Sequence, residues 1–226
     1  MSSRADAQLA ADYDLIFPDW DGMTERVVEI MNGHLPVASG ALLDAACGTG
    51  MACDAAQRLG WVVTGADSST AMLARARARL PGVEFRVAEL TRLHSDIPRT
   101  FNAVITVGNG LHLVPPAQLP LALTQMRACT RPGGVLMLVV RDLAEQRASI
   151  WRDDPTARVT SRFTKQANGQ VAWTLQIEDA DGVRTHEQLL YPLGSLELAS
   201  AVEKAGFRVT RAGKVSGRLA IAATAV

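Results

Sequence analysis

Apolar runs of strand length alternate with longer stretches of helical character over the first 140 residues. The strand-like runs are Ala41–Ala45, Trp61–Ala66, Val83–Val87, Phe101–Val107 and Val135–Val140. The helical stretches are Gly50–Leu59, Ser68–Leu80 and Pro116–Thr130, and each gives way to a turn that contains glycine or proline. Because strands that alternate with helices pack into a parallel sheet with right-handed crossovers, the pattern predicts an α/β fold.

The pattern changes after Arg141, where strand-like runs follow one another without a helix. These runs are Val159–Gln166, Val171–Glu178 and Arg184–Tyr191. Asn168-Gly169 and Asp181-Gly182 separate them, and both pairs tolerate the positive φ angles of tight hairpins. We therefore predict a small antiparallel insertion over residues 151–192 that forms a cap.

The alternation returns after the insertion, with a helix over Ser195–Ala205 and strands over Phe207–Arg211 and Leu219–Val226. Residues 1–226 are therefore expected to form one domain, with N-terminal lid helices in residues 1–40. The predicted architecture is doubly wound and Rossmann-like. It has a mostly parallel seven-stranded sheet and a small antiparallel insertion after the fifth strand.

Charge and composition exclude several classes of protein. The 23 basic and 23 acidic side chains cancel, so the chain lacks the electrostatic footprint of a general nucleic-acid binder. Its three cysteines are an odd number without metal-ligand spacing, which favours reduced thiols and no metal site. Met1–Asp12 has no signal-peptide core, and no apolar run is long enough to span a bilayer. We expect a cytoplasmic protein with a small-molecule substrate and neither a nucleic-acid nor a membrane partner. The sequence does not decide whether the protein forms a homo-oligomer.

The segment LLDAACGTGMACDAA, Leu42–Ala56, places a glycine-rich turn between a strand and a helix. Backbone N–H groups and the helix dipole at such a turn can receive a negatively charged group. A P-loop would require Gly-Lys-Ser/Thr, but Met51-Ala52 follows the last glycine. The dinucleotide fingerprint requires a third glycine where this chain has Cys53, which weakens a nicotinamide ligand without excluding it.

Two acids flank the turn and narrow the choice of ligand. Asp44 ends the first strand, where it would repel phosphate but suits an ammonium group. Asp67 ends the second strand about 20 residues further on, a position where an acid typically binds ribose hydroxyls. A nucleoside with a cationic amino-acid tail fits both acids, and S-adenosylmethionine is such a molecule. The simpler alternative is that Asp67, like Ser68 or Ser69, only caps the following helix.

Four segments, in order, resemble the motifs of class I S-adenosylmethionine-dependent methyltransferases: LLDAACGTG, TGADSSTAML, FNAVITVGNGLHLV and RPGGVLMLVVRD. Three details resemble the glycine and sarcosine N-methyltransferase group within that superfamily. They are YDLIFPDWD with the following Arg26, the VGN after the fourth strand, and the arginine that closes the fifth strand. The resemblance covers nearly the whole chain and implies the Rossmann-like fold already predicted.

The resemblance also implies roles for individual residues. Those expected around the cofactor are Tyr13, Trp20, Arg26, Asp44, Ala46, Gly48, Asp67, Ser68, Met72, Glu89, Leu90 and Val107. Arg26 is expected to pair with the cofactor's carboxylate, while Tyr13 and Trp20 close over its sulfonium. The expected catalytic residues are Tyr13, Asn109, His112 and Arg141.

Several of these assignments have a structural alternative. His112 follows Asn109 in a loop at the carboxyl edge of the sheet, where ligands bind, but a structural hydrogen bond explains it equally well. Tyr13 and Trp20 could simply pack on the sheet, and Arg141 could pair with Asp142 or a neighbouring carboxylate instead of with a substrate.

These residues lead to a functional hypothesis. We expect methyl transfer from S-adenosylmethionine to a small-molecule acceptor, namely the nitrogen of an amino-acid-like or natural-product amine. Arg141 would orient an acceptor carboxylate. The alternatives are an O- or C-methyltransferase of secondary metabolism, a nicotinamide-dependent oxidoreductase, or a non-catalytic domain that retains cofactor binding.

Overall fold

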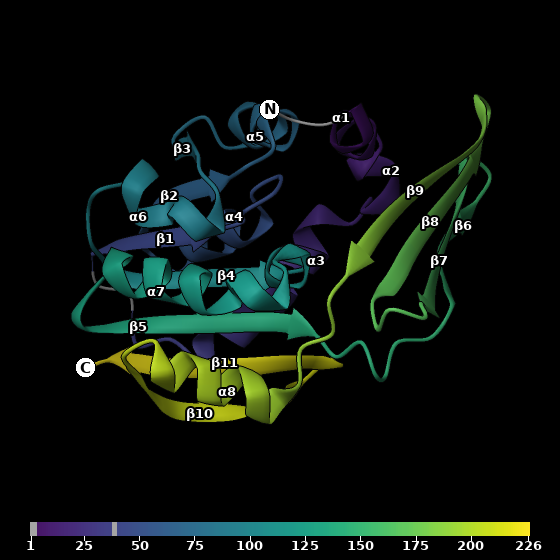
Figure 1. Cartoon of the computed structure of the whole chain (residues 1–226). Coiled ribbons are helices and arrows are strands. Elements are labelled where there is room, and N and C mark those ends of the chain that lie inside the picture. The colour runs from purple at the N-terminus through teal and green to yellow at the C-terminus, as the bar shows by residue number, and fades with distance from the viewer. Residues whose placement is uncertain (1–3, 38–39) are drawn as a thin grey trace.

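The computed structural model describes residues 4–37 and 40–226, and within them one sheet of seven strands forms the centre of the molecule (Figure 1). Its strands are β1 (Ala41–Ala45), β2 (Val62–Asp67), β3 (Glu84–Val87), β4 (Phe101–Gly108), β5 (Thr130–Arg141), β10 (Phe207–Val215) and β11 (Arg218–Ala225). Their order across the sheet is β10-β11-β5-β4-β1-β2-β3. The first five strands of the chain run parallel, while β11 lies antiparallel to both β5 and β10. The predicted fold class is confirmed.

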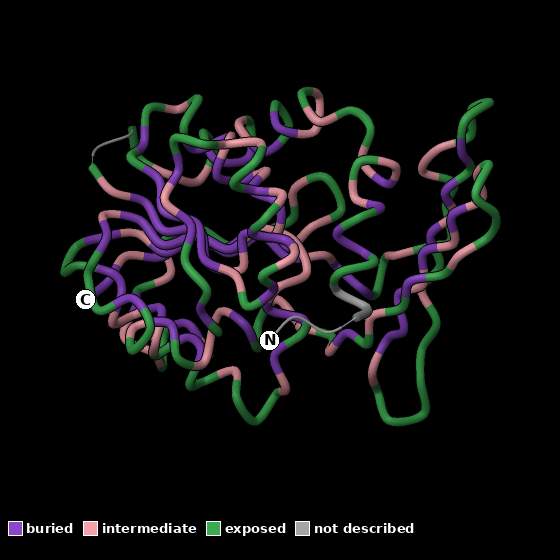
Figure 2. Tube along the Cα trace, turned by 90° about the horizontal axis from the view of Figure 1, so that it is seen from above, coloured by how far each residue is buried: buried purple, intermediate pink, exposed green. Residues whose placement is uncertain are grey.

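Helices cover both faces of this sheet. One face packs against α3 (Trp20–Asn32), α4 (Met51–Arg58) and α5 (Thr70–Arg79). The other face packs against α6 (Leu93–Asp96), α7 (Leu119–Cys129) and α8 (Ser195–Lys204). Short 3₁₀ turns are η1 (Leu90–Arg92), η2 (Gly110–Leu113) and η3 (Pro116–Gln118). Figure 2 shows the buried strands running through the middle of the molecule between these helices.

The apolar run in β5 has the burial that its sequence predicts. Leu136, Leu138 and Val140 pack into the core on the side of α7, whereas Met137 and Val139 pack into the core on the side of α4. Side chains of a strand alternate between faces, so a strand covered on both faces has to be apolar at every position. The strand also extends further than predicted, because residues 131–134 bulge out of register between Thr130 and Val135.

The insertion forms a separate antiparallel sheet in the order β6-β7-β8-β9. Its strands are β6 (Ser149–Asp154), β7 (Ala157–Lys165), β8 (Val171–Asp179) and β9 (Gly182–Leu190). Three of these were predicted, and their two hairpin turns have glycines with positive φ, Gly169 at 84° and Gly182 at 111°. The fourth, β6, was missed because its sequence SIWRDD is mostly polar and its residues are at most half-buried.

Two short helices, α1 (Arg4–Ala11) and α2 (Tyr13–Ile16), lie between α5 and this cap sheet (Figure 1). Leu9, Ile16, Trp173 and Leu175 are among the residues of a third buried core at this junction. The N-terminal segment therefore joins the cap to the main domain. Residues 1–3 and 38–39 of the predicted lid region lie outside the described residues.

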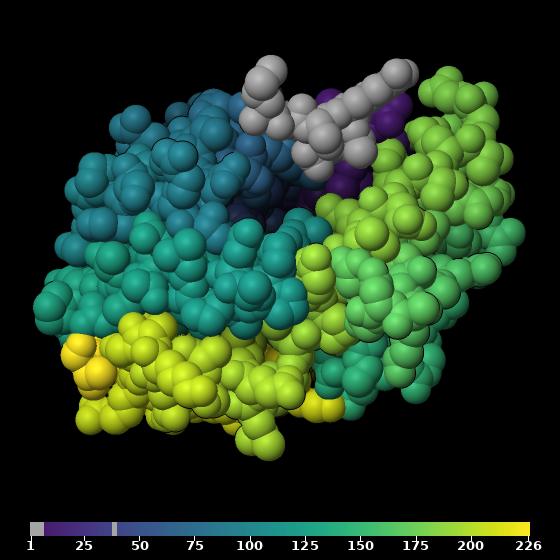
Figure 3. Space-filling model, in the orientation of Figure 1, coloured from purple at the N-terminus to yellow at the C-terminus, as the bar shows by residue number. Residues whose placement is uncertain are grey.

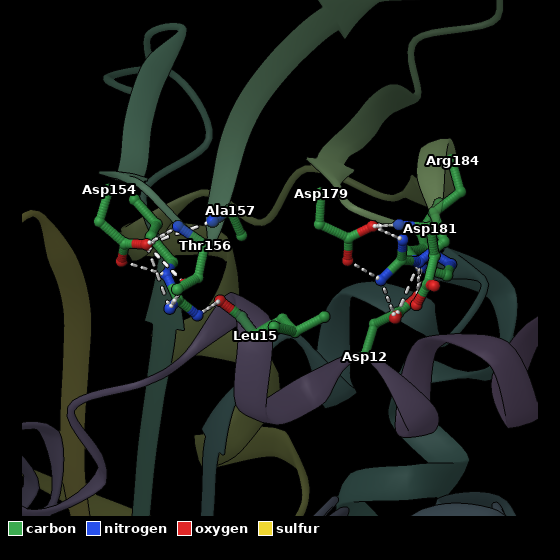
Figure 4. Close-up of polar contacts among 10 residues, drawn as sticks. Asp12, Leu15, Asp154, Thr156, Ala157, Asp179, Asp181 and Arg184 are labelled. Atoms are coloured by element: carbon green, nitrogen blue, oxygen red, sulfur yellow. Dashed lines mark hydrogen bonds and ion pairs between the residues drawn. The ribbon is translucent and has the colours of Figure 1, made fainter.

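Ion pairs hold this N-terminal segment on both sides. Arg184 of β9 donates to Asp12 at 2.6 Å and to Asp179 at 2.8 Å (Figure 4). His186 Nε2 lies 2.7 Å from Asp12 Oδ2. Burial tends to raise the pKa of Asp12, but the hydrogen bonds from Arg184 and His186 outweigh that effect and hold it below its usual value. On the opposite side, Asp14 pairs with Arg75 and Arg79 of α5 at 2.6 and 2.8 Å.

None of the helices in the described ranges is long and apolar enough to cross a membrane. Within residues 4–37 and 40–226, no group of three or more His, Cys, Asp or Glu side chains could hold a metal ion.

Candidate active site

The glycine-rich turn between β1 and α4 reverses the chain through three left-handed residues. Ala46, Gly48 and Gly50 have φ angles of 66°, 56° and 91°. A Cβ added at Gly48 would meet no atom within 4 Å, so open space lies beside the backbone there. At Gly50 an added Cβ would lie 3.1 Å from Leu80 Cδ1. The turn therefore needs glycine at position 50 both for its conformation and for its packing against α5.

Asp67, at the carboxyl end of β2, holds this turn in place. Its Oδ2 accepts the Gly48 N–H at 2.8 Å, and its Oδ1 accepts the Ser69 N–H at 2.8 Å. The N-cap of α5 is Ser69, whose hydroxyl accepts the Met72 N–H at 3.3 Å. The Asp67 side chain thus connects the end of β2 to the turn that follows β1, in addition to bonding the segment that begins α5.

A cavity of about 540 Å³ opens at the carboxyl ends of β1, β4 and β5, beneath the N-terminal segment and the cap. In Figure 3 the surface is hollowed between the blue part of the sheet domain and the green cap. The predicted site residues that line the cavity are Tyr13, Arg26, Ala46, Gly48, Asp67, Ser68, Met72, Glu89, Leu90, Val107, Asn109 and Arg141. Three predicted residues, Trp20, Asp44 and His112, do not line it.

Asp44 lies behind the glycine turn, with 1% of its surface exposed. Its Oδ2 accepts the Cys53 thiol at 3.3 Å, and its Oδ1 has no hydrogen-bond partner among the described residues. Burial raises the pKa of Asp44 to about 7, and the charge of Asp67 adds to that rise. A carboxyl in this position borders the cofactor region without facing the cavity.

Trp20 lies on the outer side of α3. Its Nε1 donates to Asp54 Oδ2 at 2.7 Å, and the guanidinium of Arg79 stacks 3.9 Å from the centre of its ring. The structure thus packs Trp20 against α4 and α5, neither over the cavity nor on the sheet. Tyr13 does line the cavity, and burial raises the pKa of its hydroxyl.

His112 is fully buried where the cap insertion joins the main domain, next to Arg141 and Tyr191. Its Nδ1 lies 2.9 Å from the carbonyl oxygen of Tyr191, and its Nε2 lies 3.1 Å from that of Arg141. Burial lowers the pKa of the imidazole and so favours the neutral ring. Both ring nitrogens face backbone, so this geometry fits the structural alternative and not contact with an acceptor.

Arg141 projects into the cavity from the end of β5. Its Nε donates to Asn109 Oδ1 at 3.0 Å, and its guanidinium lies 5.2 Å from the ring centre of Trp173 and 5.3 Å from that of Trp151. Burial lowers its pKa to about 10. Asp142, the alternative partner considered from the sequence, instead pairs with Lys214 at 2.6 Å. The alternative is therefore wrong.

Several residues that line the cavity were not predicted from the sequence. They include Leu9, Phe17, Met23, Val27, Ile30, Trp173, Gln188, Ser216 and Arg218. The spacing of Met23, Val27 and Ile30 follows one face of α3 and could have been recognised beside Arg26. Arg218 is the first residue of an apolar strand, and Arg141 is the last residue of another. The sequence pattern does not show that these two strands pair, so it could not place Arg218 beside Arg141.

Comparisons with known proteins show similarity to methyltransferases. The family model for a methyltransferase domain matches residues 42–134. The chain is 29% identical to an uncharacterized methyltransferase of Synechocystis sp., over 80% of its own length and 84% of that protein. It is 26% identical to dTDP-3-amino-3,4,6-trideoxy-alpha-D-glucopyranose N,N-dimethyltransferase of Streptomyces venezuelae, over 87% and 89% of the two chains. The solved structure of S-adenosylmethionine-bound CalS10, an amino pentose methyltransferase from Micromonospora echinaspora, matches with a TM-score of 0.71, 27% identity and 92% coverage of each chain.

The sheet order and the glycine turn are those of a Rossmann-like fold, and the methyltransferase-domain model matches residues 42–134 of the chain. The S-adenosylmethionine-bound structure of CalS10 supports S-adenosylmethionine as the cofactor. The residues of the cavity fit that molecule: the space beside Gly48 is open, and the lining offers a carboxylate at Asp67, a guanidinium at Arg26 and apolar side chains at Met72 and Leu90. These comparisons do not single out the glycine and sarcosine group.

Proposed function

We propose that the protein transfers a methyl group from S-adenosylmethionine to the nitrogen of a small-molecule amine. The observation that carries this proposal is that one cavity contains both the turn held by Asp67 and, at its other side, Arg141 with Asn109. Two relatives whose names state their reaction act on amino sugars, which supports an amine acceptor. Among the amino-acid-like and natural-product amines that the sequence predicts as acceptors, we therefore favour amino sugars.

The cofactor would be held by residues from both halves of the cavity. Asp67 would accept hydrogen bonds from the ribose hydroxyls, and Arg26 would pair with the carboxylate. Met72 and Leu90 would pack against the adenine, with Glu89 at its edge. When bound, the cofactor supplies a methyl group already activated on a sulfonium.

The protein's own contribution is alignment and the exclusion of water. Leu9 of α1, Tyr13 of α2 and Trp173 of the cap sheet line the cavity. An amine acceptor has to arrive with a free lone pair, and burial near Arg141 favours its neutral form. Asn109 Oδ1 holds Arg141 Nε, so Asn109 acts as a positioning residue and Arg141 orients the acceptor.

An assay of S-adenosylhomocysteine release tests this proposal directly. The panel should contain amino acids, amino sugars, phenols and heterocycles, and the methylated atom should be located by NMR. We expect turnover of at least one amine with methylation on nitrogen. Turnover only of phenols or carbon nucleophiles would overturn N-methylation in favour of the O- or C-methyltransferase alternative. Cofactor binding without turnover of any acceptor would support a non-catalytic domain.

A further inference from the structure

Two arginines face each other across the strands β5 and β11. Arg141, the last residue of β5, is the register partner of Arg218, the first residue of β11. Side chains at directly opposed positions of an antiparallel pair lie on the same face, with Cβ atoms about 5 Å apart. Both arginines line the cavity and both are half-buried. Two like charges are therefore held side by side in the wall of the site.

Neither arginine has a carboxylate partner in the described ranges of the chain. Neither forms an ion pair there, and Asp142 and Glu145, the nearest acids along the chain, both pair with Lys214. The carboxylates that line the cavity are Asp67 and Glu89, which follow β2 and β3. In sheet order β2 is three strands from β5, a distance of about 14 Å at the usual strand spacing.

This arrangement costs stability in the free protein. Like charges directly opposite each other in a sheet are destabilising, and burial lowers the pKa of both guanidinium groups. Three aromatic rings and Asn109 support Arg141, but the side chain of Arg218 forms no hydrogen bond with a described residue. Ser216, two residues before Arg218, also lines the cavity and has a φ of 47°, unusual for a residue with a side chain. An anion bound here would relieve the repulsion.

We propose that Arg141 and Arg218 form a subsite for a phosphoryl group of the acceptor, either a phosphate ester or a diphosphate. This proposal rests on the function proposed above and names a chemical feature of its substrate. A single carboxylate would neutralise only one of the two guanidinium groups, whereas a phosphoryl dianion neutralises both. The planar fork of arginine also matches phosphate oxygens in a two-pronged contact. The Ser216 hydroxyl adds a donor at the same wall.

Isothermal titration with two anionic probes tests the subsite. Inorganic phosphate and pyrophosphate are titrated into the full-length protein at constant ionic strength, with and without S-adenosylhomocysteine, and acetate serves as the carboxylate probe. The variants are Arg218→Gln and Arg218→Lys. Arg208→Gln is the matched control, because Arg208 is an exposed arginine on the neighbouring strand β10.

We expect pyrophosphate or phosphate to bind the wild type more tightly than acetate. Arg218→Gln should weaken that binding by about tenfold or more, Arg218→Lys by less, and Arg208→Gln by less than about twofold. The dissociation constant of S-adenosylhomocysteine should stay the same in all variants, which also shows that they are folded. The probe that binds more tightly distinguishes a diphosphate from a phosphate ester.

Equal binding of acetate and the phosphoryl probes, or equal loss in the Arg208 and Arg218 variants, would overturn the subsite. Failure of the wild type to bind S-adenosylhomocysteine would overturn the proposed function instead. The anion titration without S-adenosylhomocysteine still decides the subsite in that case, so the two failures are distinguishable.

Discussion

Replacing Asp44 with asparagine should remove a pH-dependent loss of stability. Burial raises the pKa of Asp44 from 3.8 to about 7, so between these values the folded protein keeps a proton that the unfolded chain has released. Stability is therefore highest below the lower value and falls as pH rises through the interval. One pKa unit corresponds to about 1.4 kcal/mol, so from pH 5 to pH 8 the loss should total about 3 kcal/mol. Asparagine has nearly the same shape and does not titrate.

Urea unfolding of the cofactor-free protein at pH 5, 6, 7 and 8 measures this effect. The unfolding free energy of Asp44→Asn, relative to wild type, should rise by about 3 kcal/mol across the series. Asp153→Asn is the control, because Asp153 is an exposed aspartate on β6, and its profile should run parallel to that of wild type. Parallel profiles for Asp44→Asn as well would refute the reasoning, because they would show that the buried carboxyl is ionised at no cost.

Four other changes test the site and its cover. Asp67→Ala should weaken S-adenosylmethionine binding by about 2–5 kcal/mol in calorimetry, because it removes charge-assisted hydrogen bonds, and unchanged affinity would reduce Asp67 to a structural residue. Arg141→Lys should raise the KM of the best acceptor and leave the cofactor's Kd unchanged; identical kinetics for an acceptor without an acidic group would contradict an anion-binding role. Shortening the hairpin at Asn168-Gly169 should leave cofactor affinity intact, and its loss in a folded variant would show that the cap belongs to the cofactor site. Asp12→Ala should lower the unfolding free energy by about 1–3 kcal/mol, because it leaves His186 and one side of Arg184 without a partner; a thermal melt equal to wild type would contradict that.

The central sheet was predictable because its pattern is strong and local. β1 was predicted with the bounds that the structure has, and the glycine turn was placed correctly between it and α4. The last two strands were also found, but their pairing beside β5 was not, because it joins residues about 80 positions apart. The position of Arg218 in the cavity could therefore not be derived from the sequence.

The assignment of single side chains was less predictable, for a physical reason. Trp20, His112 and Arg141 are all amphipathic, and sequence position alone does not decide whether such a side chain meets a ligand or a neighbouring helix. In the structure Trp20 contacts Asp54 and Arg79, and His112 contacts two backbone carbonyl oxygens. Strand β6 was missed for a related reason. An edge strand that is little buried needs few apolar residues, so its sequence shows no clear alternation of apolar and polar positions.

The contacts of His112 make the cap a separable module. The insertion leaves the main domain after Arg141 and returns at Tyr191, and the one imidazole contacts the carbonyl oxygens of both residues. Tyr191 N–H also donates to the carbonyl oxygen of His112 at 2.8 Å. The neutral imidazole donates its single N–H to one of these oxygens, and together with the Tyr191 N–H bond it holds the two crossing points close together. Positions 141 and 191 are therefore natural boundaries for a graft, through which a different cap could be exchanged onto the same cofactor-binding half.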